Sequence, residues 1–297
     1  MSVVPVTSPT TARVPRPRPK KTMSPVAVRR TLRLVAILVV GLGMAFPLLY
    51  MLSLSLMTPT DVSAYPPHLL PPSVNWHSYV DAISYLSFRP VLNSTIFSVS
   101  VVVLQLTIGV MAGFALAKIP FRGAAVIVGL FVIPMFLPSN VAIIPTYVIA
   151  AKLGWVNTYA GMIIPIVGQT AFATLLFRQF FLGVPRELIE AARIDGAGWF
   201  NVLGRIALPL ARPAIAAYCS VTFLGAWNMY IWPLIIAPKP EMATLPVALA
   251  PLARSQYQLV TPNVGLAAAV LSTLPVLLVF LLTQKWYVRG VVGTGVD

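Results

Sequence analysis

The chain has 297 residues, of which 58% are hydrophobic and 9% are charged, and its formal net charge is +14. Soluble domains carry about 25% charged residues, so this composition excludes a single soluble core. The one cysteine, Cys219, excludes an internal disulfide and a thiolate metal cluster, and no metal site is expected.

The first 30 residues are rich in Pro, Ser, Thr and basic side chains. Such a segment cannot bury enough apolar surface to fold, so we expect a disordered basic tail over residues 1–30. Residues 31–297 should then form one membrane domain, and its first apolar run fits an uncleaved signal anchor.

Long apolar segments predict an all-α membrane protein with six transmembrane helices. About 20 apolar residues in a helix cross a hydrocarbon core of about 30 Å. The prolines within 134–145 predict a kinked or interrupted third span. The predicted spans are residues 34–56, 91–117, 124–148, 158–177, 213–237 and 264–284.

The basic residues are distributed unevenly between the two sets of connecting segments. Seventeen of the 21 Lys and Arg residues lie in the N-terminal tail and after spans two, four and six, and four lie on the other side. The positive-inside rule therefore predicts a multi-pass protein of the cytoplasmic membrane with both termini and the loop 178–212 in the cytoplasm. The positive net charge thus reflects the orientation of the chain in the membrane. Its expected partner is anionic membrane lipid, and no nucleic acid partner is expected.

A polar segment, PRELIEAARIDGAGWFNVLGRIALPLARP, separates the fourth and fifth spans at 185–213. Pro185 suits the first turn of a helix and Gly196 suits the left-handed position that ends one, so 185–195 should form a short helix. A second helix should begin near Trp199 and stop at Leu208-Pro209, just before the fifth span. The general alternative for such a segment is an amphipathic loop on the membrane surface.

Within this segment, Glu190-Ala191-Ala192 precedes Gly196, and Ile206-x-Leu208-Pro209 follows, in the pattern EAA-x3-G-x9-I-x-LP. The pattern resembles the EAA loop of the membrane subunits of binding-protein-dependent ABC importers. Further segments resemble the carbohydrate-uptake branch of these permeases, similar to those for maltose and sn-glycerol 3-phosphate: 175–188, 223–234 and 282–296. The last four residues, 294–297, depart from the usual family ending.

The resemblance implies a type I ABC importer permease fold in which the loop 183–212 receives a separate ATPase. Glu190 and Arg193 would form salt bridges with the ATPase, and Ala191 and Ala192 would pack into the interface. The implied partners are a second homologous permease, an ATP-binding cassette ATPase dimer, and an extracellular or lipid-anchored substrate-binding protein. The coupling residues carried over are Glu190, Ala191, Ala192, Arg193, Asp195, Gly196, Ile206, Leu208 and Pro209.

This chain has no GxxxxGK[ST] motif, so we expect a non-enzymatic transport subunit without a cofactor of its own. ATP and Mg would be bound by the partner ATPase. The interiors of the predicted spans contain no ionisable residue, which disfavours a proton-coupled secondary carrier.

Amide and aromatic side chains in the spans suit a neutral, hydroxyl-rich ligand. The substrate-path candidates are Gln169, Trp227, Asn228, Tyr230 and Trp232. The alternative role for each is interhelical hydrogen bonding or an interfacial aromatic belt. The sequence therefore predicts half of a path for a sugar or oligosaccharide, with glycerol 3-phosphate or its diesters as the alternative substrate. The substrate pocket lies in this chain or in the partner permease.

Overall fold

The computed structural model describes the backbone of residues 25–253 and 261–292, and these ranges contain helices and no strand. The chain divides into two units, Met1–Leu49 and Tyr50–Asp297. Helix α1 begins at Pro25, which corrects the prediction of disorder up to residue 30. Proline suits a first helical turn, and the apolar residues after it continue the helix. The remainder of the tail and residues 294–297 lie outside the described residues.

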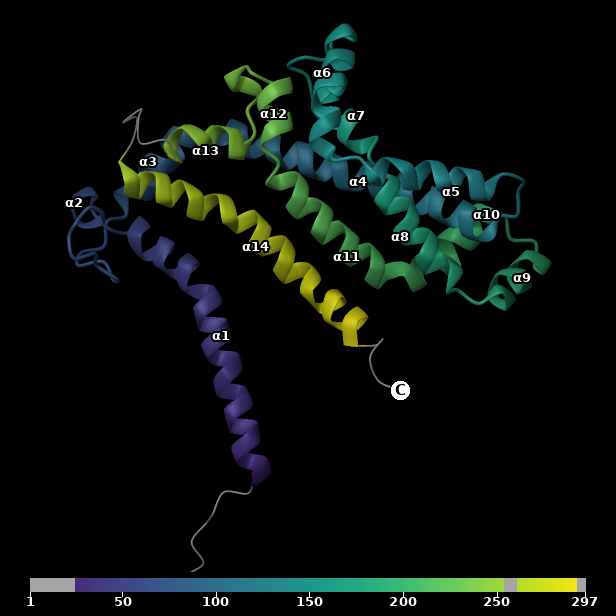
Figure 1. Ribbon diagram of the computed structural model, residues 1–297, viewed down its shortest axis with the longest axis horizontal. Helices are drawn as coiled ribbons and strands as arrows, with labels where there is room; N and C mark the ends of the chain where they lie inside the picture. Colours follow the sequence, from purple (N-terminus) through teal and green to yellow (C-terminus); the bar gives the residue numbers. More distant parts are fainter. Residues whose placement is uncertain (1–24, 254–260, 293–297) are drawn as a thin grey trace, which may run out of the picture. The chain divides into compact units, whose positions relative to one another are not determined.

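Helix α1 (Pro25–Ser55) links the two units, and Figure 1 labels the elements in chain order. The other α-helices are α2 (Pro59–Val62), α3 (His77–Leu86), α4 (Phe88–Lys118), α5 (Ala124–Val132), α6 (Ile143–Lys152), α7 (Tyr159–Val167), α8 (Ala171–Leu182), α9 (Arg186–Ile194), α10 (Trp199–Val202), α11 (Leu208–Trp227), α12 (Ile231–Ile236), α13 (Leu245–Ala253) and α14 (Pro262–Val292). Short 3-10 or π segments are η1 (Ile133–Phe136), η2 (Ser139–Ala142), η3 (Leu203–Ala207) and η4 (Pro240–Met242).

Four helices of the described chain are long and apolar enough to cross a membrane. They are Leu32–Ser55, Phe88–Lys118, Trp199–Trp227 and Pro262–Gln284. The pair α7 and α8 provides a fifth span if the two are counted together, since they are bent by 43° at a short break. The predicted first, second and sixth spans thus correspond to continuous helices, the fourth to a bent pair, and the fifth only in part to the helix Trp199–Trp227.

The predicted third span, 124–148, is interrupted. Helix α5 ends at Val132, two 3-10 segments follow, and α6 restarts at Ile143. Pro134 and Pro138 cause the break, because proline donates no backbone hydrogen bond and its ring displaces the preceding turn. Irregular backbone at membrane depth is tolerated where it is buried in protein or lines a cavity.

The fifth span differs from its prediction at both ends. The expected stop at Leu208-Pro209 is wrong, because α10, the π segment η3 and α11 form one helix from Trp199 to Trp227. The wider π turn precedes Pro209 and gives its ring room beside the earlier carbonyls. At the other end α11 stops at Trp227, and the separate helix α12 follows after a short break.

Close packing between α4 and α8 forms the centre of the second unit. A Cβ atom at Gly109 would lie 2.5 Å from the Cβ of Ala173, and one at Gly113 would lie 2.7 Å from the backbone nitrogen of Arg178. Small residues permit such close approach of membrane helices, where lipid competes with side chains for apolar contacts. Helix α11 packs against α4 and α14, so α4 contacts both the bent pair and the fifth span.

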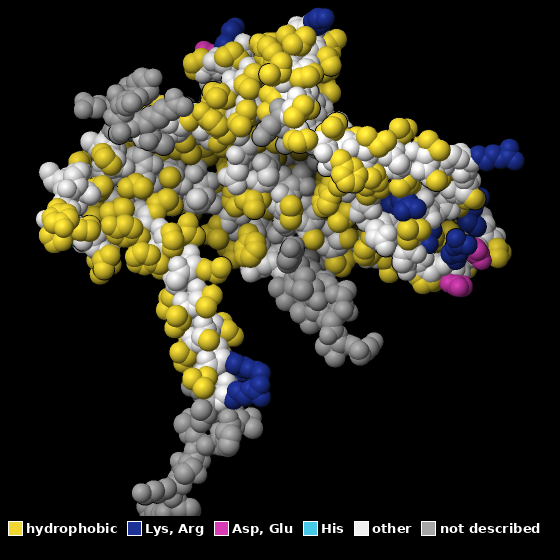
Figure 2. All heavy atoms as spheres, in the orientation of Figure 1, with side chains coloured by type: hydrophobic (Ala, Val, Ile, Leu, Met, Phe, Trp, Pro, Cys, Tyr) yellow, Lys and Arg dark blue, Asp and Glu magenta, His cyan; other side chains and the backbone are white. Residues whose placement is uncertain are grey.

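The surface of the second unit has apolar sides and a charged end. Figure 2 shows hydrophobic side chains over most of the visible helical surface of the second unit, while Lys, Arg, Asp and Glu gather around α9 and α10. The exposed charged residues of this segment include Arg186, Glu187, Glu190, Arg193 and Asp195. The polar loop therefore lies at a charged end of the otherwise apolar second unit.

Candidate functional site

The loop helix α9 begins at Arg186 and ends at Ile194, with Pro185 as its N-terminal cap residue. Gly196 has a φ of +82°, the left-handed conformation predicted for it. The backbone nitrogen of Gly196 donates to Arg193 O at 3.1 Å, and that of Ala197 donates to Ala192 O at 2.9 Å. These paired bonds form a Schellman motif, which satisfies the last carbonyls of the helix and fixes the direction in which the chain leaves it.

One face of α9 packs against the core of its own chain. Ile189 is buried beside Val184, and Ala192 is partly buried against the same cluster. Ala192 therefore packs partly against its own chain and keeps part of its surface exposed. Ala191 is exposed and remains accessible to a partner.

Arg193 is engaged within the loop itself. Its Nη1 donates to Ala197 O at 2.8 Å, and its guanidinium carbon lies 4.6 Å from the centre of the Trp199 ring. The Trp199 ring in turn meets Phe114 of α4 edge to face, with centroids 6.3 Å apart. Arg193 thus connects the turn between α9 and α10 to the second span through Trp199 and Phe114. Glu190 is exposed, so its carboxylate is accessible for an intermolecular ion pair.

The loop carries exposed apolar side chains on α9 and α10. Leu188 is 48% exposed, Ile194 is 86% exposed and Phe200 is 78% exposed. Leu188, Ala191 and Ile194 recur at a spacing of three residues, which places them on one side of a short helix. The sequence predicts such a mixed apolar and charged face for the helix at 185–195, and the structure adds Phe200 of α10 to its exposed apolar side chains.

The remaining predicted coupling residues belong to the helix end or to the base of the fifth span. Asp195 is the exposed C-cap residue of α9. Ile206 and Leu208 are half-buried against the core cluster that also contains Ile189, and Pro209 is exposed in the first turn of α11. The loop and the fifth span are therefore connected by packed residues and by continuous helix.

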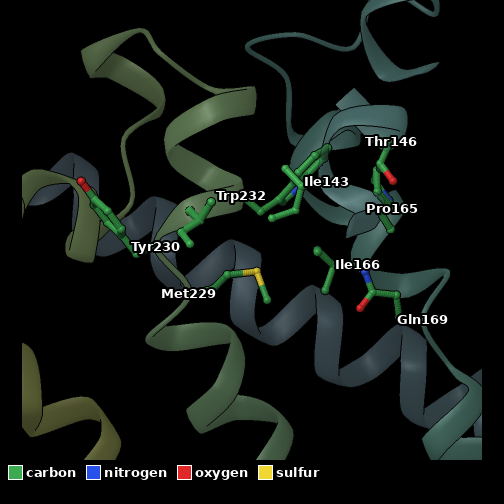
Figure 3. A pocket seen from close by; sticks show the side chains of 10 residues that line it. Ile143, Thr146, Pro165, Ile166, Gln169, Met229, Tyr230 and Trp232 are labelled. Carbon is green, nitrogen blue, oxygen red and sulfur yellow. The ribbon is translucent and has the colours of Figure 1, made fainter. Parts of the chain in front are cut away.

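A cavity of about 460 Å³ lies where three apolar segments are interrupted. One wall comes from η2 and α6, a second from the bend between α7 and α8, and a third from the break between α11 and α12. Figure 3 shows Met229 and Ile166 facing each other across it, with Gln169 beside Ile166. Its lining residues are Ala142, Ile143, Thr146, Pro165, Ile166, Gln169, Met229, Tyr230, Ile231 and Trp232.

Three of the five predicted substrate-path residues line this cavity: Gln169, Tyr230 and Trp232. Gln169 is exposed and Tyr230 is half-buried, so both offer polar groups to a ligand. Trp232 is buried and its Nε1 donates to Met162 O at 3.1 Å, which leaves its ring as an apolar part of the wall.

The other two candidates lie away from the cavity. Trp227 is buried, stacks on Phe223 with centroids 5.5 Å apart, and donates from Nε1 to Ser272 O of α14 at 3.2 Å. That is the interhelical role offered as its alternative. Asn228 is the exposed C-cap residue of α11 and is not among the lining residues. Thr146, which the sequence reasoning did not select, contributes a hydroxyl to the wall.

The lining contains an amide, hydroxyls, aromatic rings and aliphatic side chains, but no charged residue. Within the described residues, no group of three or more His, Cys, Asp or Glu is placed to hold a metal ion. The chemistry available at the cavity is therefore hydrogen bonding to neutral polar groups and contact with apolar surface.

Comparisons with known proteins agree with this arrangement. Residues 105–293 match the family described as binding-protein-dependent transport system inner membrane component. A permease protein of the sn-glycerol-3-phosphate transport system, UgpE of Agrobacterium fabrum, is 34% identical over 88% of this chain and 96% of its own length. The UgpE protein of Brucella abortus is 35% identical over 87% of this chain and 94% of its own.

A solved structure shares the fold. It belongs to a bacterial ABC transporter involved in the import of the acidic polysaccharide alginate, and it aligns with a TM-score of 0.77 over 91% of this chain and all of that chain, at 24% identity. The fold is thus that of an ABC importer permease, as expected from the loop. The protein is a multi-pass inner membrane transport subunit and belongs to the family of inner membrane components of binding-protein-dependent transport systems.

Proposed function

We propose that this chain forms half of the translocation path of an ATP-driven importer for a neutral sugar or oligosaccharide. The observation that carries the proposal is the cavity of about 460 Å³ between interrupted helices, which is lined by Gln169, Thr146 and Tyr230 but by no charge. Amides and hydroxyls exchange hydrogen bonds with sugar hydroxyls, and aromatic and aliphatic walls cover the apolar faces of a sugar ring.

Energy for transport would come from a partner ATPase, which binds ATP and Mg and docks on the cytoplasmic loop. Support comes from the exposed face of α9, where Glu190 offers charge and Ile194 offers apolar area. A second homologous permease would form the other half of the path, and a substrate-binding protein would deliver the ligand from outside.

Glycerol 3-phosphate is the second candidate substrate. The relatives in Agrobacterium fabrum and Brucella abortus carry that substrate in their names, at 34% and 35% identity. A phosphate would need cationic partners. The cavity lining contains none, so the partner permease would have to supply them.

The test is substrate-stimulated ATP hydrolysis in a reconstituted complex. The tagged chain is purified with its co-purifying permease and ATPase, placed in proteoliposomes with the cognate binding protein, and offered neutral mono- and oligosaccharides or glycerol 3-phosphate. We expect stimulation by a neutral sugar. Gln169→Ala should raise its half-saturating concentration several-fold, since a lost hydrogen bond is worth about 0.5–1.5 kcal/mol.

Gln179→Ala is the matched control, because Gln179 is an exposed glutamine of α8 that does not line the cavity. It should behave like the wild type. Stimulation by glycerol 3-phosphate alone would replace the sugar with the second candidate. Equal effects of the two glutamine substitutions would count against the cavity as the sugar site.

A further inference from the structure

We infer that Gln105 and Tyr218 form a positioning pair that couples the fifth span to the opposite wall of the cavity. The Nε2 of Gln105 in α4 donates to Ile166 O at 2.6 Å, and the hydroxyl of Tyr218 in α11 donates to the Oε1 of Gln105 at 2.9 Å. One amide therefore connects three helices. The inference rests on the proposed transport function, and neither residue is among those that line the cavity.

Burial makes these bonds strong constraints. Gln105 is 7% exposed and Tyr218 is 5% exposed, so neither has water as an alternative partner. A carbonyl oxygen only accepts, which requires the amide nitrogen of Gln105 to face Ile166 and its oxygen to face Tyr218. Loss of the Tyr218 hydroxyl would leave the buried Oε1 of Gln105 without this donor, which costs more than the bond itself contributes, whereas the Tyr218 hydroxyl has a second side-chain partner in Thr222.

The carbonyl that Gln105 holds belongs to the bend of the fourth span. Ile166 O also accepts from the backbone nitrogen of Gln169 at 3.1 Å, within the short break between α7 and α8. The side chains of Ile166 and Gln169 line the cavity. Gln105 thus fixes the backbone from which one wall is built.

Tyr218 belongs to the helix that connects the cytoplasmic loop to another wall. The helix runs without interruption from Trp199, which contacts Arg193, to Trp227, just before the lining residues Met229 and Tyr230. Tyr218 lies roughly 28 Å along it from Trp199. A displacement of α11 by the loop would therefore shift its own wall directly and the Ile166 wall through the Tyr218–Gln105 pair.

Aromatic packing limits the ways in which Tyr218 can move independently of α8. Its ring meets Phe177 edge to face with centroids 5.5 Å apart and stacks near Phe172 at 6.4 Å. Tyr218→Phe keeps these contacts and removes only the hydroxyl. Gln105→Leu keeps a side chain of similar size and removes both hydrogen bonds. Both variants therefore test the polar connection with little change in packing volume.

Hydrogen–deuterium exchange measures the coupling without any substrate. The full complex in nanodiscs is compared with and without ATP, and exchange is followed in peptides covering 161–175 and 199–210. In the wild type we expect a nucleotide-dependent change in both segments. Tyr218→Phe and Gln105→Leu should keep the change at 199–210 and lose most of it at 161–175. Ser220→Ala is the control, because the Ser220 hydroxyl bonds only to Ala216 O within its own helix.

Substrate-stimulated ATP hydrolysis provides the second measurement. Each variant should lower the stimulated rate about 2- to 10-fold while basal hydrolysis and complex yield stay unchanged, and the double variant should be no worse than Gln105→Leu alone. A wild-type change confined to 199–210, or variants that exchange like Ser220→Ala, would overturn the inference. Wild-type coupling in both segments without stimulation by any sugar would instead overturn the proposed substrate and leave the pair in place.

Discussion

The turn after α9 depends on one backbone angle, the φ of +82° at Gly196. Side chains with a Cβ are disfavoured there, and β-branched ones most of all. The Schellman bonds to Ala192 O and Arg193 O require this conformation, and Arg193 then reaches both Ala197 and Trp199. A single glycine therefore determines how the exposed face of α9 is presented.

Gly196→Val should distort the end of the coupling helix. We expect a loss of about 1–2 kcal/mol in local stability and a several-fold weaker association with the ATPase, measured by co-purification and by binding of the isolated ATPase to the permease pair. Gly198→Val is the control, because Gly198 is extended with a φ of −71° and a Cβ there meets no atom within 4 Å. Equal behaviour of the two variants would refute the role assigned to the left-handed turn.

Glu190→Lys should weaken docking of the ATPase while membrane insertion is retained. The carboxylate is exposed and makes no hydrogen bond or ion pair within the described part of the chain, so its reversal acts on the outer surface. Replacing a partly desolvated ion pair with a contact between like charges weakens the free energy of binding by about 1 kcal/mol or more, so recovery of the ATPase should fall about tenfold. Glu241→Lys, the same charge change in a loop expected on the opposite side of the membrane, should leave recovery unaltered. Normal coupled hydrolysis in Glu190→Lys would contradict the assignment.

Helix packing in this protein uses small residues where a soluble protein would use large ones. Gly109 and Gly113 stand four residues apart in α4 and face α8 at distances that leave no room for a Cβ. This Gly-x-x-x-Gly spacing is visible in the sequence and typical of close membrane helix pairs. It holds together the span that carries Gln105 and the span that carries the cavity wall.

Gly113→Ala should therefore destabilise the protein. The new Cβ would lie 2.7 Å from the backbone nitrogen of Arg178 and 2.8 Å from Thr174 O, and backbone cannot move aside as a flexible side chain can. Overpacking of this kind costs about 1–3 kcal/mol, which should lower the thermal midpoint in detergent by several degrees. Gly129→Ala is the control: Gly129 lies in α5 with no atom within 4 Å of the added Cβ, and alanine there should be neutral or stabilising. A lowered midpoint in both variants would show that loss of glycine, not the clash, is responsible.

The elements were predictable to different degrees, for physical reasons. Apolar length and the cluster of prolines at 134–145 indicated the spans and the break in the third one. Which side of a span faces the protein was harder to predict, because lipid is as apolar as the core and leaves no amphipathic period. Trp227 and Tyr230 illustrate this: both are aromatic residues beside the break between α11 and α12, yet Trp227 packs on α14 and Tyr230 lines the cavity.

The loop was the most predictable part of the candidate site, since its spacing encodes a helix end rather than a tertiary contact. The left-handed Gly196 and the short helix before it follow from local rules alone. The partial burial of Ala192 against the core cluster and the contact of Arg193 with Trp199 of α10 depend on tertiary packing, which no local rule specifies. The continuous helix through Pro209 was not predicted, because the π turn that precedes the proline has no clear sequence signal.

At the scale of the whole molecule, the basic residues and the walls of the cavity come from different parts of the chain. Seventeen of the 21 basic residues lie in the tail and in alternate connecting segments, including the segment with α9 and α10. The walls of the cavity come instead from chain breaks inside the apolar segments. The expected orientation therefore has the coupling loop in the cytoplasm, with the cavity connected to it by the continuous helix from Trp199 to Trp227.

Thiol labelling checks this orientation directly. In a Cys219→Ser background, Ser73→Cys places a thiol in an exposed loop before α3, and Asn201→Cys places one on the exposed side of α10. A membrane-impermeant maleimide applied to cells without their walls should label residue 73 at once and residue 201 only after permeabilisation, because the positive-inside rule retains the basic loop in the cytoplasm. The reverse pattern would place the loop outside, out of reach of any cytoplasmic ATPase, and would remove the basis for coupling through Glu190 and Gly196.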